Sequence, residues 1–206
     1  MPATNEALTQ YTATFDLVGL SPFSHSKPLT EKKKKGEADD DFENRIWRQR
    51  LHTNANDQVV LPAMMLKSCL AGLAQYRSER IPGKGQQTYS KNFLAAVMCF
   101  EDMPLLDAAG TPLMAEHIEG ERLFLNADGK RGGGVRVWRI YPRIPEGWKA
   151  TAKVLCVDGL ITPAKLEEYA KDAGLMIGFG RFRPRNGGHY GRFKIENFRH
   201  VAGLES

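Results

Sequence analysis

Cysteine and histidine are too few and too scattered in this chain to build a disulfide framework or a zinc site. The three cysteines, Cys69, Cys99 and Cys156, are far apart, lie in apolar surroundings and form no CxxC pair. The five histidines contain no HxxxH spacing, so we expect no metal site. The odd number of cysteines indicates buried free thiols in a reducing compartment.

Long apolar runs and targeting segments are also missing. No stretch approaches the length of a membrane span, and the first residues lack the basic and then apolar pattern of a signal peptide. We therefore expect a cytoplasmic protein without a membrane partner. The flexible basic turn at residues 83–88, GKGQQT, lacks the GxxxxGK[ST] spacing of a phosphate-binding loop. This excludes nucleotide hydrolysis, and no cofactor is predicted.

The length and composition are those of one globular domain. The chain has 206 residues, of which 42% are hydrophobic and 26% are charged, which is enough to bury a sizeable core. Its formal net charge of +5 favours an anionic partner. We predict a single domain over residues 1–206, with insertions at about 24–58 and 102–134.

Alternation of apolar and polar residues predicts several strands. The clearest is at residues 11–20, and an apolar run at 93–100 indicates a short buried strand. Residues 135–141 form another predicted strand, with 149–157 as its partner. The insertion holds a candidate hairpin around residues 122–126, and the basic C-terminal stretch supplies the final strand.

Two helices are predicted from their end signals and apolar stripes. Pro62 opens the first, which ends before Ile81 and buries one stripe: Leu66, Cys69, Leu70, Leu73 and Tyr76. For the second, over residues 163–173, Thr162 is the N-cap and Gly174 follows the last turn. The order of elements predicts an α+β, ferredoxin-like or RRM-like (βαββαβ) palm with long insertions after the first strand and first helix.

The most basic stretch lies near the C-terminus, where residues 177–200 contain six Lys or Arg and one acidic residue. An extended backbone would place four residues spaced by two on one side: Phe179, Arg181, Arg183 and Arg185. Gly187 and Gly188 allow positive φ and the close approach of another backbone. A basic ribbon with interleaved aromatics favours a nucleic-acid backbone as ligand. The alternative is an edge hairpin whose charges keep other strands away.

Residues 24–58 form a long polar excursion after the first strand. It contains four consecutive lysines at 32–35 and an acidic run at 39–41, a composition expected to be mobile in the isolated protein. Residues 42–52 mix bulky and basic side chains instead. They fit either a loop that orders against a partner or a short amphipathic helix that caps the core.

Three segments together resemble the RAMP superfamily, the repeat-associated proteins of CRISPR systems. Residues 15–22, FDLVGLSP, resemble its opening strand, residues 59–70, VVLPAMMLKSCL, its strand-to-helix entry, and residues 178–193 its C-terminal glycine-rich loop. The chain departs from the family pattern at Met64 and Met65, where small residues are usual, and at Ser68, which replaces a glycine. The resemblance implies a ferredoxin-like palm that binds single-stranded guide RNA, commonly as repeated backbone subunits of an effector filament.

The leading hypothesis is a non-catalytic module that binds single-stranded RNA (crRNA) as a homo-oligomer or filament within a multi-subunit complex, with target nucleic acid as a further candidate partner. Arginines and lysines would hold phosphates, the paired glycines would offer N–H groups, and Phe179, Tyr190 or Trp47 would stack bases. The candidate binding residues are Arg45, Arg48, Arg50, Lys67, Lys84, Phe179, Arg181, Arg183, Arg185, Asn186, Gly187, Gly188, His189, Tyr190 and Arg192.

Two other hypotheses stay open at this stage. Some RAMP relatives cut target RNA with an aspartate after the first strand, so Asp39, Asp40 and Asp41 could serve a metal-dependent endonuclease, with Arg45 and Arg48 stabilising the charge that develops. The simpler interpretation is a solvated acidic run that balances the lysines. The third hypothesis is a structural or decoy protein, including a virus-encoded mimic, that docks on another protein and never contacts RNA.

Overall fold

The computed structural model describes residues 10–127 and 134–203, which form an antiparallel sheet covered by helices. The strands are β1 (Tyr11–Gly19), β3 (Val97–Met98), β7 (Lys149–Cys156) and β8 (Phe193–Ala202), in the spatial order β3-β7-β1-β8. The predicted alternation of the first strand is confirmed, because Tyr11, Ala13, Phe15 and Leu17 are all buried. The chain therefore has an α+β fold.

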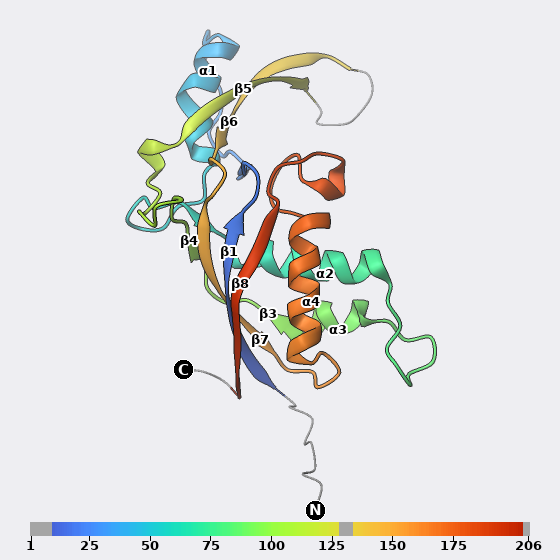
Figure 1. Cartoon of the computed structure of the whole chain (residues 1–206). Coiled ribbons are helices and arrows are strands. Elements are labelled where there is room, and N and C mark those ends of the chain that lie inside the picture. The colour runs from blue at the N-terminus through green and yellow to red at the C-terminus, as the bar shows by residue number, and fades with distance from the viewer. Residues whose placement is uncertain (1–9, 128–133, 204–206) are drawn as a thin grey trace, which may run out of the picture.

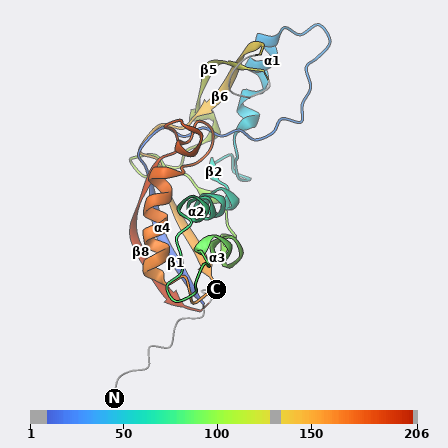
Figure 2. The same ribbon diagram turned by 90° about the vertical axis from the view of Figure 1, so that its right-hand side faces the viewer.

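Three helices pack on one face of this sheet (Figure 2). They are α2 (Ala63–Arg77), α3 (Tyr89–Ala96) and α4 (Pro163–Met176). Leu66 and Leu70 of α2 are fully buried, and the ring of Tyr169 on α4 stacks on Phe93 of α3 at 4.4 Å between centroids. The main core lies between these helices and the inner face of the sheet.

A second part of the chain projects beyond the end of the sheet (Figures 1 and 2). It consists of α1 (Asp39–Ile46), the 3-10 turn η1 (Trp47–Arg50) and a hairpin of β5 (Glu119–Asn126) and β6 (Arg136–Arg143), which we call the arm. Ile46 of α1 and Trp47 of η1 are both buried. Of the two alternatives for residues 42–52, the structure therefore shows the short amphipathic helix. The short pair β2 (Val60–Leu61) and β4 (Met103–Pro104) and the turn η2 (Ala115–His117) lie in the connections.

One carboxylate anchors the arm. Glu43 of α1 is 1% exposed and accepts hydrogen bonds from Arg50 (2.9 and 3.1 Å), Arg139 (2.6 Å) and the backbone N–H of Ile140 (3.0 Å). Arg50 also donates to the Ile140 carbonyl. A buried ion pair is tolerated when further hydrogen bonds satisfy it, as here. Glu43 thus joins α1, η1 and β6.

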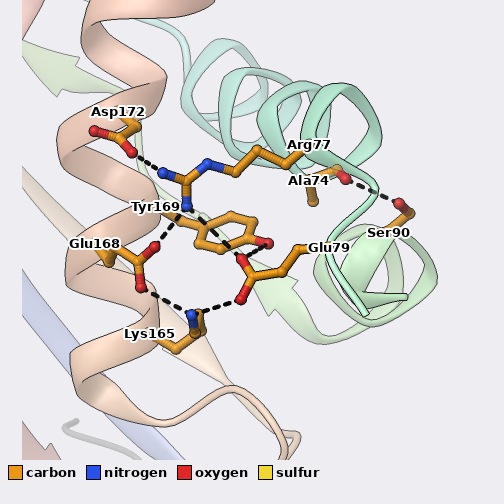
Figure 3. A network of polar contacts seen from close by, with 8 residues as sticks. All are labelled: Ala74, Arg77, Glu79, Ser90, Lys165, Glu168, Tyr169 and Asp172. Atoms are coloured by element: carbon orange, nitrogen blue, oxygen red, sulfur yellow. Dashed lines mark hydrogen bonds and ion pairs between the residues drawn. The ribbon is translucent and has the colours of Figure 1, made fainter. Parts of the chain in front are cut away.

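An ion-pair network joins α2 to α4 on the other side of the molecule (Figure 3). Arg77 of α2 pairs with Glu168 (2.7 Å) and with Asp172, and its guanidinium lies over the Tyr169 ring at 5.0 Å. Glu79 accepts from the Tyr169 hydroxyl and from Lys165, both at 2.9 Å. Because Arg77 and Lys165 each pair with more than one carboxylate, the network fixes the packing of the two helices better than isolated surface pairs would.

Two predicted strands are wrong in extent or pairing. Residues 93–96 belong to α3, and only Val97 and Met98 form a strand. Tyr89 and Phe93, one helical turn apart, are both buried on the same face of α3. A short apolar run cannot distinguish a buried helix from a strand. The strand predicted at 135–141 pairs with β5 and not with 149–157, which pairs with β1 and β3. The candidate hairpin near 122–126 does contain β5.

The predicted helix ends also need correction. Thr162 caps α4 as predicted, since its side chain accepts from the Lys165 backbone N–H at 3.2 Å. The helix continues past Gly174 to Met176, however. An added Cβ at Gly174 would lie 2.1 Å from the Phe193 carbonyl oxygen, so the glycine permits close packing of α4 on β8. In α2, Tyr76 is 68% exposed and does not belong to the buried stripe.

No helix in the described ranges, 10–127 and 134–203, is long and apolar enough to cross a membrane.

Candidate nucleic-acid interface

The first part of the basic stretch forms a folded loop before β8, so the prediction of an extended ribbon is wrong there, whereas the predicted final strand is confirmed as β8. We call residues 178–192 the glycine-rich loop. Positive φ at Gly178 (67°), Gly180 (63°) and Phe182 (53°) and a 3-10 turn, η3 (Pro184–Asn186), bend the backbone repeatedly. Phe179 does not share a side with the arginines, because it is 1% exposed and stacks on Phe193 at 4.4 Å. Phe179 and the three arginines predicted to lie beside it therefore do not share one side of the backbone.

The paired glycines close the loop on itself. The N–H of Gly187 donates to the Pro184 carbonyl (2.8 Å), and that of Gly188 donates to the Arg183 carbonyl (3.1 Å). A Cβ on Gly188 would lie 1.8 Å from the Phe182 carbonyl oxygen. Both N–H groups are thus occupied, which contradicts the prediction that they face phosphate oxygens. The expected close approach of another backbone is confirmed, and that backbone is the loop's own.

A cleft of about 890 Å³ separates the glycine-rich loop from the β5–β6 hairpin. In Figure 1 the hairpin arches over the loop, which lies above the end of α4. The lining residues are basic, aromatic, uncharged polar, aliphatic or small, and none of those in the described ranges is acidic. They are Ser26, Phe124, Leu125, Asn126, Ala127, Arg136, Arg139, Tyr141, Gly180, Arg181, Phe182, Asn186, Gly187 and Gly188.

Arg181 lines this cleft from the glycine-rich loop. Its guanidinium is 3.8 Å from the centre of the Tyr141 ring and 5.2 Å from that of Phe182. Its Nε is buried and has no hydrogen-bond partner in the part of the chain that the structure describes. Burial lowers the pKa of Arg181, and the positive charge of Arg50 lowers it further. The electrostatic interaction with Tyr141 acts in the opposite direction. Arg181 is therefore a cation without a counter-charge among residues 10–127 and 134–203.

The other loop arginines point elsewhere. Arg185 lies against α2, where a Cβ at Gly72 would be 2.7 Å from its Nη1. Burial raises the pKa of the Cys69 thiol to about 12, and the positive charges of Arg183 and Arg185 oppose that rise. Arg192 is exposed at the start of β8. Within the described residues, Arg181 and these three arginines form no salt bridge.

The arginines predicted near α1 behave differently. Arg45 pairs with Glu37 (2.8 Å) and with Glu31, and its hydrogen bonds lower the pKa of Glu37 to about 2. Arg50 is 5% exposed and held by Glu43, so it stabilises the arm and cannot reach a ligand. Arg48 is exposed and lies over the Trp47 ring at 4.3 Å, and Trp47 itself is buried.

The remaining predicted residues are dispersed. Lys67 is half-buried on α2, while Lys84 is exposed in the connection between α2 and α3. That connection lies far from the glycine-rich loop in both views (Figures 1 and 2). Asn186 lines the cleft, and His189 is exposed beside Tyr190, at 4.9 Å between rings. The Tyr190 hydroxyl donates to the Glu121 carboxylate at 3.0 Å, which ties the loop to β5.

The acidic run does not assemble a metal site. Asp39, Asp40 and Asp41 form the first turn of α1. Asp39 pairs with Lys33 (2.6 Å) and Asp40 with Arg122 (2.7 Å). Over the residues that the structure describes, no three His, Cys, Asp or Glu side chains group closely enough to hold a metal ion.

The hairpin wall of the cleft is not among the residues predicted from the sequence. Strand β6, RVWRIYPR, carries Arg136, Arg139 and Tyr141, and β5 carries Phe124. The mixture of arginines and aromatic residues in β6 is the same signal that marks the C-terminal stretch. The predicted pairing of residues 135–141 with 149–157 conceals this signal, because it places β6 in the central sheet, where alternate side chains are buried.

Comparison with known proteins gives matches in structure alone. No model of a protein family matches this sequence, and neither does any curated protein. Cmr6 from Pyrococcus furiosus is similar in structure, with a TM-score of 0.50 and 12% identity over 92% of this chain and 99% of that one. The RAMP resemblance is confirmed in the fold.

A second solved structure is similar over nearly the whole chain. It is a chain of the Type III-B Cmr-beta complex bound to cognate target RNA, with a TM-score of 0.50 and 9% identity. The alignment covers 96% of this chain but only 63% of that chain's length. At these identities the likeness concerns the fold, and the residues of the cleft must be judged on their own chemistry.

Proposed function

We propose that this protein binds single-stranded guide RNA as a non-catalytic subunit of a CRISPR-type ribonucleoprotein complex. One observation carries the proposal: within the described residues, the four arginines of the glycine-rich loop have no carboxylate partner, and Arg181 lines a cleft whose described lining contains no acidic residue. Five other arginines are paired with carboxylates, namely Arg45, Arg50, Arg77, Arg122 and Arg139. Guanidinium groups on one loop that have no such partner suit the phosphates of a nucleic acid.

The palm is proposed to have the ferredoxin-like topology. Its elements follow the order β1, α2, β3, β7, α4, β8 when the arm, the β2–β4 pair and the additional helix α3 are set aside. Each βαβ unit is split, since β7 lies between β1 and β3, and β1 lies between β7 and β8. This supports the split βαβ arrangement. The arm and the β2–β4 pair are then insertions into that palm.

The uncovered face of the sheet is a poor alternative site. RRM domains stack bases on aromatic residues of that face. Here the outward positions of β1, β7 and β8 carry aliphatic or polar side chains, among them Thr14, Lys153 and Arg199, which are cross-strand neighbours. The two phenylalanines of β8 are also engaged, Phe193 with Phe179 and Phe198 with Phe15 of the inner face. The RNA is therefore proposed to lie at the end of the sheet, in the cleft and over the loop.

Affinity for RNA should depend on the individual loop arginines. Fluorescence anisotropy with a labelled oligouridine would measure the dissociation constant from low to high salt. Arg192→Gln and Arg185→Gln should each weaken binding and reduce the slope of log K against log salt by about 0.7. Lys171→Gln is a matched control, because it removes an exposed charge on α4 that pairs only locally with Glu167. Equal effects of all three variants, or no binding at low salt, would refute the proposal.

Assembly is tested separately. A subunit of an RNA-bound complex should co-purify with nucleic acid in large particles that nuclease treatment reduces. The decoy hypothesis predicts a clean monomer that binds no oligonucleotide. The endonuclease hypothesis is disfavoured because Asp39 and Asp40 are engaged in ion pairs. Cleavage of target RNA that is lost in an Asp39→Ala or Asp40→Ala variant would reverse this ranking.

A further inference from the structure

The cleft has the chemistry of a nucleobase pocket as well as that of a phosphate site. Three aromatic residues line it, with Phe124 and Tyr141 from the hairpin and Phe182 from the glycine-rich loop. Phe124 is 48% exposed although it is a large apolar side chain. Apolar rings favour a stacked base, whereas a phosphate alone would be bound as well by the exposed arginines outside the cleft.

Arg181 is held rigidly at this position. Its backbone N–H donates to the Ser24 carbonyl at 3.1 Å, and a Cβ at the preceding Gly180 would lie 2.2 Å from that oxygen. Phe182, which follows it, has a left-handed φ of 53°, a conformation that is uncommon for an aromatic residue. The guanidinium is then fixed by the rings of Tyr141 and Phe182. Its orientation is thus determined before any ligand binds.

The Tyr141 ring is in turn supported from the arm. The Arg50 guanidinium lies 4.7 Å from its centre, and Arg50 is bonded to Glu43 and to the Ile140 carbonyl. Two contacts therefore join the hairpin to the loop beside the cleft, Arg181 on Tyr141 and the Tyr190 hydroxyl on Glu121. A fixed, half-buried guanidinium without a counter-charge is unfavourable unless a ligand supplies acceptors.

We propose that the cleft receives one unstacked base of the bound strand and that Arg181 favours guanine there. The planar guanidinium donates two parallel hydrogen bonds, and guanine offers the matching acceptors N7 and O6 on one edge. Adenine has nearly the same size and stacking surface but carries an amino donor in place of O6. This inference rests on the proposed RNA binding and adds a base preference to it.

The test compares two purines in one RNA. Oligouridines of about ten nucleotides with a single central guanosine or adenosine would be titrated into the intact protein by anisotropy, so that the strand can bring its purine to the cleft. The guanosine RNA should bind about tenfold more tightly than the adenosine RNA. The Arg181→Lys variant, which keeps the charge but loses the fork, should bind both equally. Arg192→Lys, outside the cleft, should keep the preference.

The outcomes separate this inference from the proposed function. If both RNAs bind with equal affinity to the unmodified protein, or if Arg181→Lys keeps the preference, the base pocket is refuted and the RNA-binding role stands. If neither RNA binds at low salt, the proposed function itself fails. Circular dichroism of Arg181→Lys establishes that the variant is folded. A second variant, Phe124→Leu, should weaken binding of both RNAs by removing a stacking surface while keeping the guanosine preference.

Discussion

Removing the Glu43 carboxylate is the sharpest test of how the arm is held. In a Glu43→Ala variant the Arg50 guanidinium, which is 5% exposed, loses its only carboxylate partner among the described residues, and Arg139 and the Ile140 N–H lose an acceptor. Breaking a buried ion pair by deleting one partner costs about 3–5 kcal/mol. That is a large fraction of the total stability of about 5–15 kcal/mol for a domain. The arm should therefore be the first part of the chain to unfold.

Urea denaturation followed by circular dichroism would measure the loss, and hydrogen exchange of β5 and β6 would locate it. Asp41→Ala is the matched control, since it removes an exposed carboxylate from the first turn of the same helix and should cost less than about 1 kcal/mol. If Glu43→Ala and Asp41→Ala unfold at the same urea concentration and exchange alike, the anchoring role of Glu43 is wrong.

The same residue predicts a pH dependence. Burial raises the pKa of Glu43, but hydrogen bonds from Arg50, Ile140 and Arg139 outweigh burial and leave the pKa below its ordinary value. A lowered pKa contributes stability that is present above the pKa of the unfolded chain and is lost as the pH falls through that of the folded chain. Acid should therefore destabilise the arm, and Glu43→Gln should flatten this dependence in urea titrations at several pH values.

Three further variants test the palm. Gly174→Ala should destabilise the protein by about 1–3 kcal/mol in thermal unfolding, because its methyl group would collide with the Phe193 carbonyl; an unchanged melting temperature would contradict the packing of α4 on β8. Arg77→Gln should cost about 1 kcal/mol at low salt and less at high salt, measured by urea unfolding, because its partners are partly exposed; a salt-independent loss would argue against the ion-pair network. Phe179→Ala should cost about 3–5 kcal/mol in urea unfolding, since the ring is fully buried; a stable variant with weakened RNA binding would instead restore its predicted role in base stacking.

Elements with local signals were predictable from the sequence, and elements that depend on distant partners were not. The alternation in β1 and the Thr162 cap of α4 are encoded within a few residues, and both are confirmed. The pairing of β6 is not encoded in this way, because a strand that could pair with β7 across a short turn instead pairs with β5 in the arm. Gly174 illustrates a similar ambiguity, since a glycine near a helix end fits both a C-cap and a close helix–strand contact.

The roles of the arginines depend most on long-range structure. Arg50 and Arg181 both lie over the Tyr141 ring, yet only Arg50 has a buried carboxylate partner among the described residues. That partner is on α1, and the ring comes from a strand about ninety residues further along the chain. A sequence pattern shows where arginines are concentrated, but not which carboxylates they pair with in the fold. It therefore indicates the basic stretch without distinguishing arginines that pack within the protein from those that can bind a ligand. The hairpin supplies the other wall of the cleft, and the base preference of Arg181 is consequently a property of the folded arm and loop together.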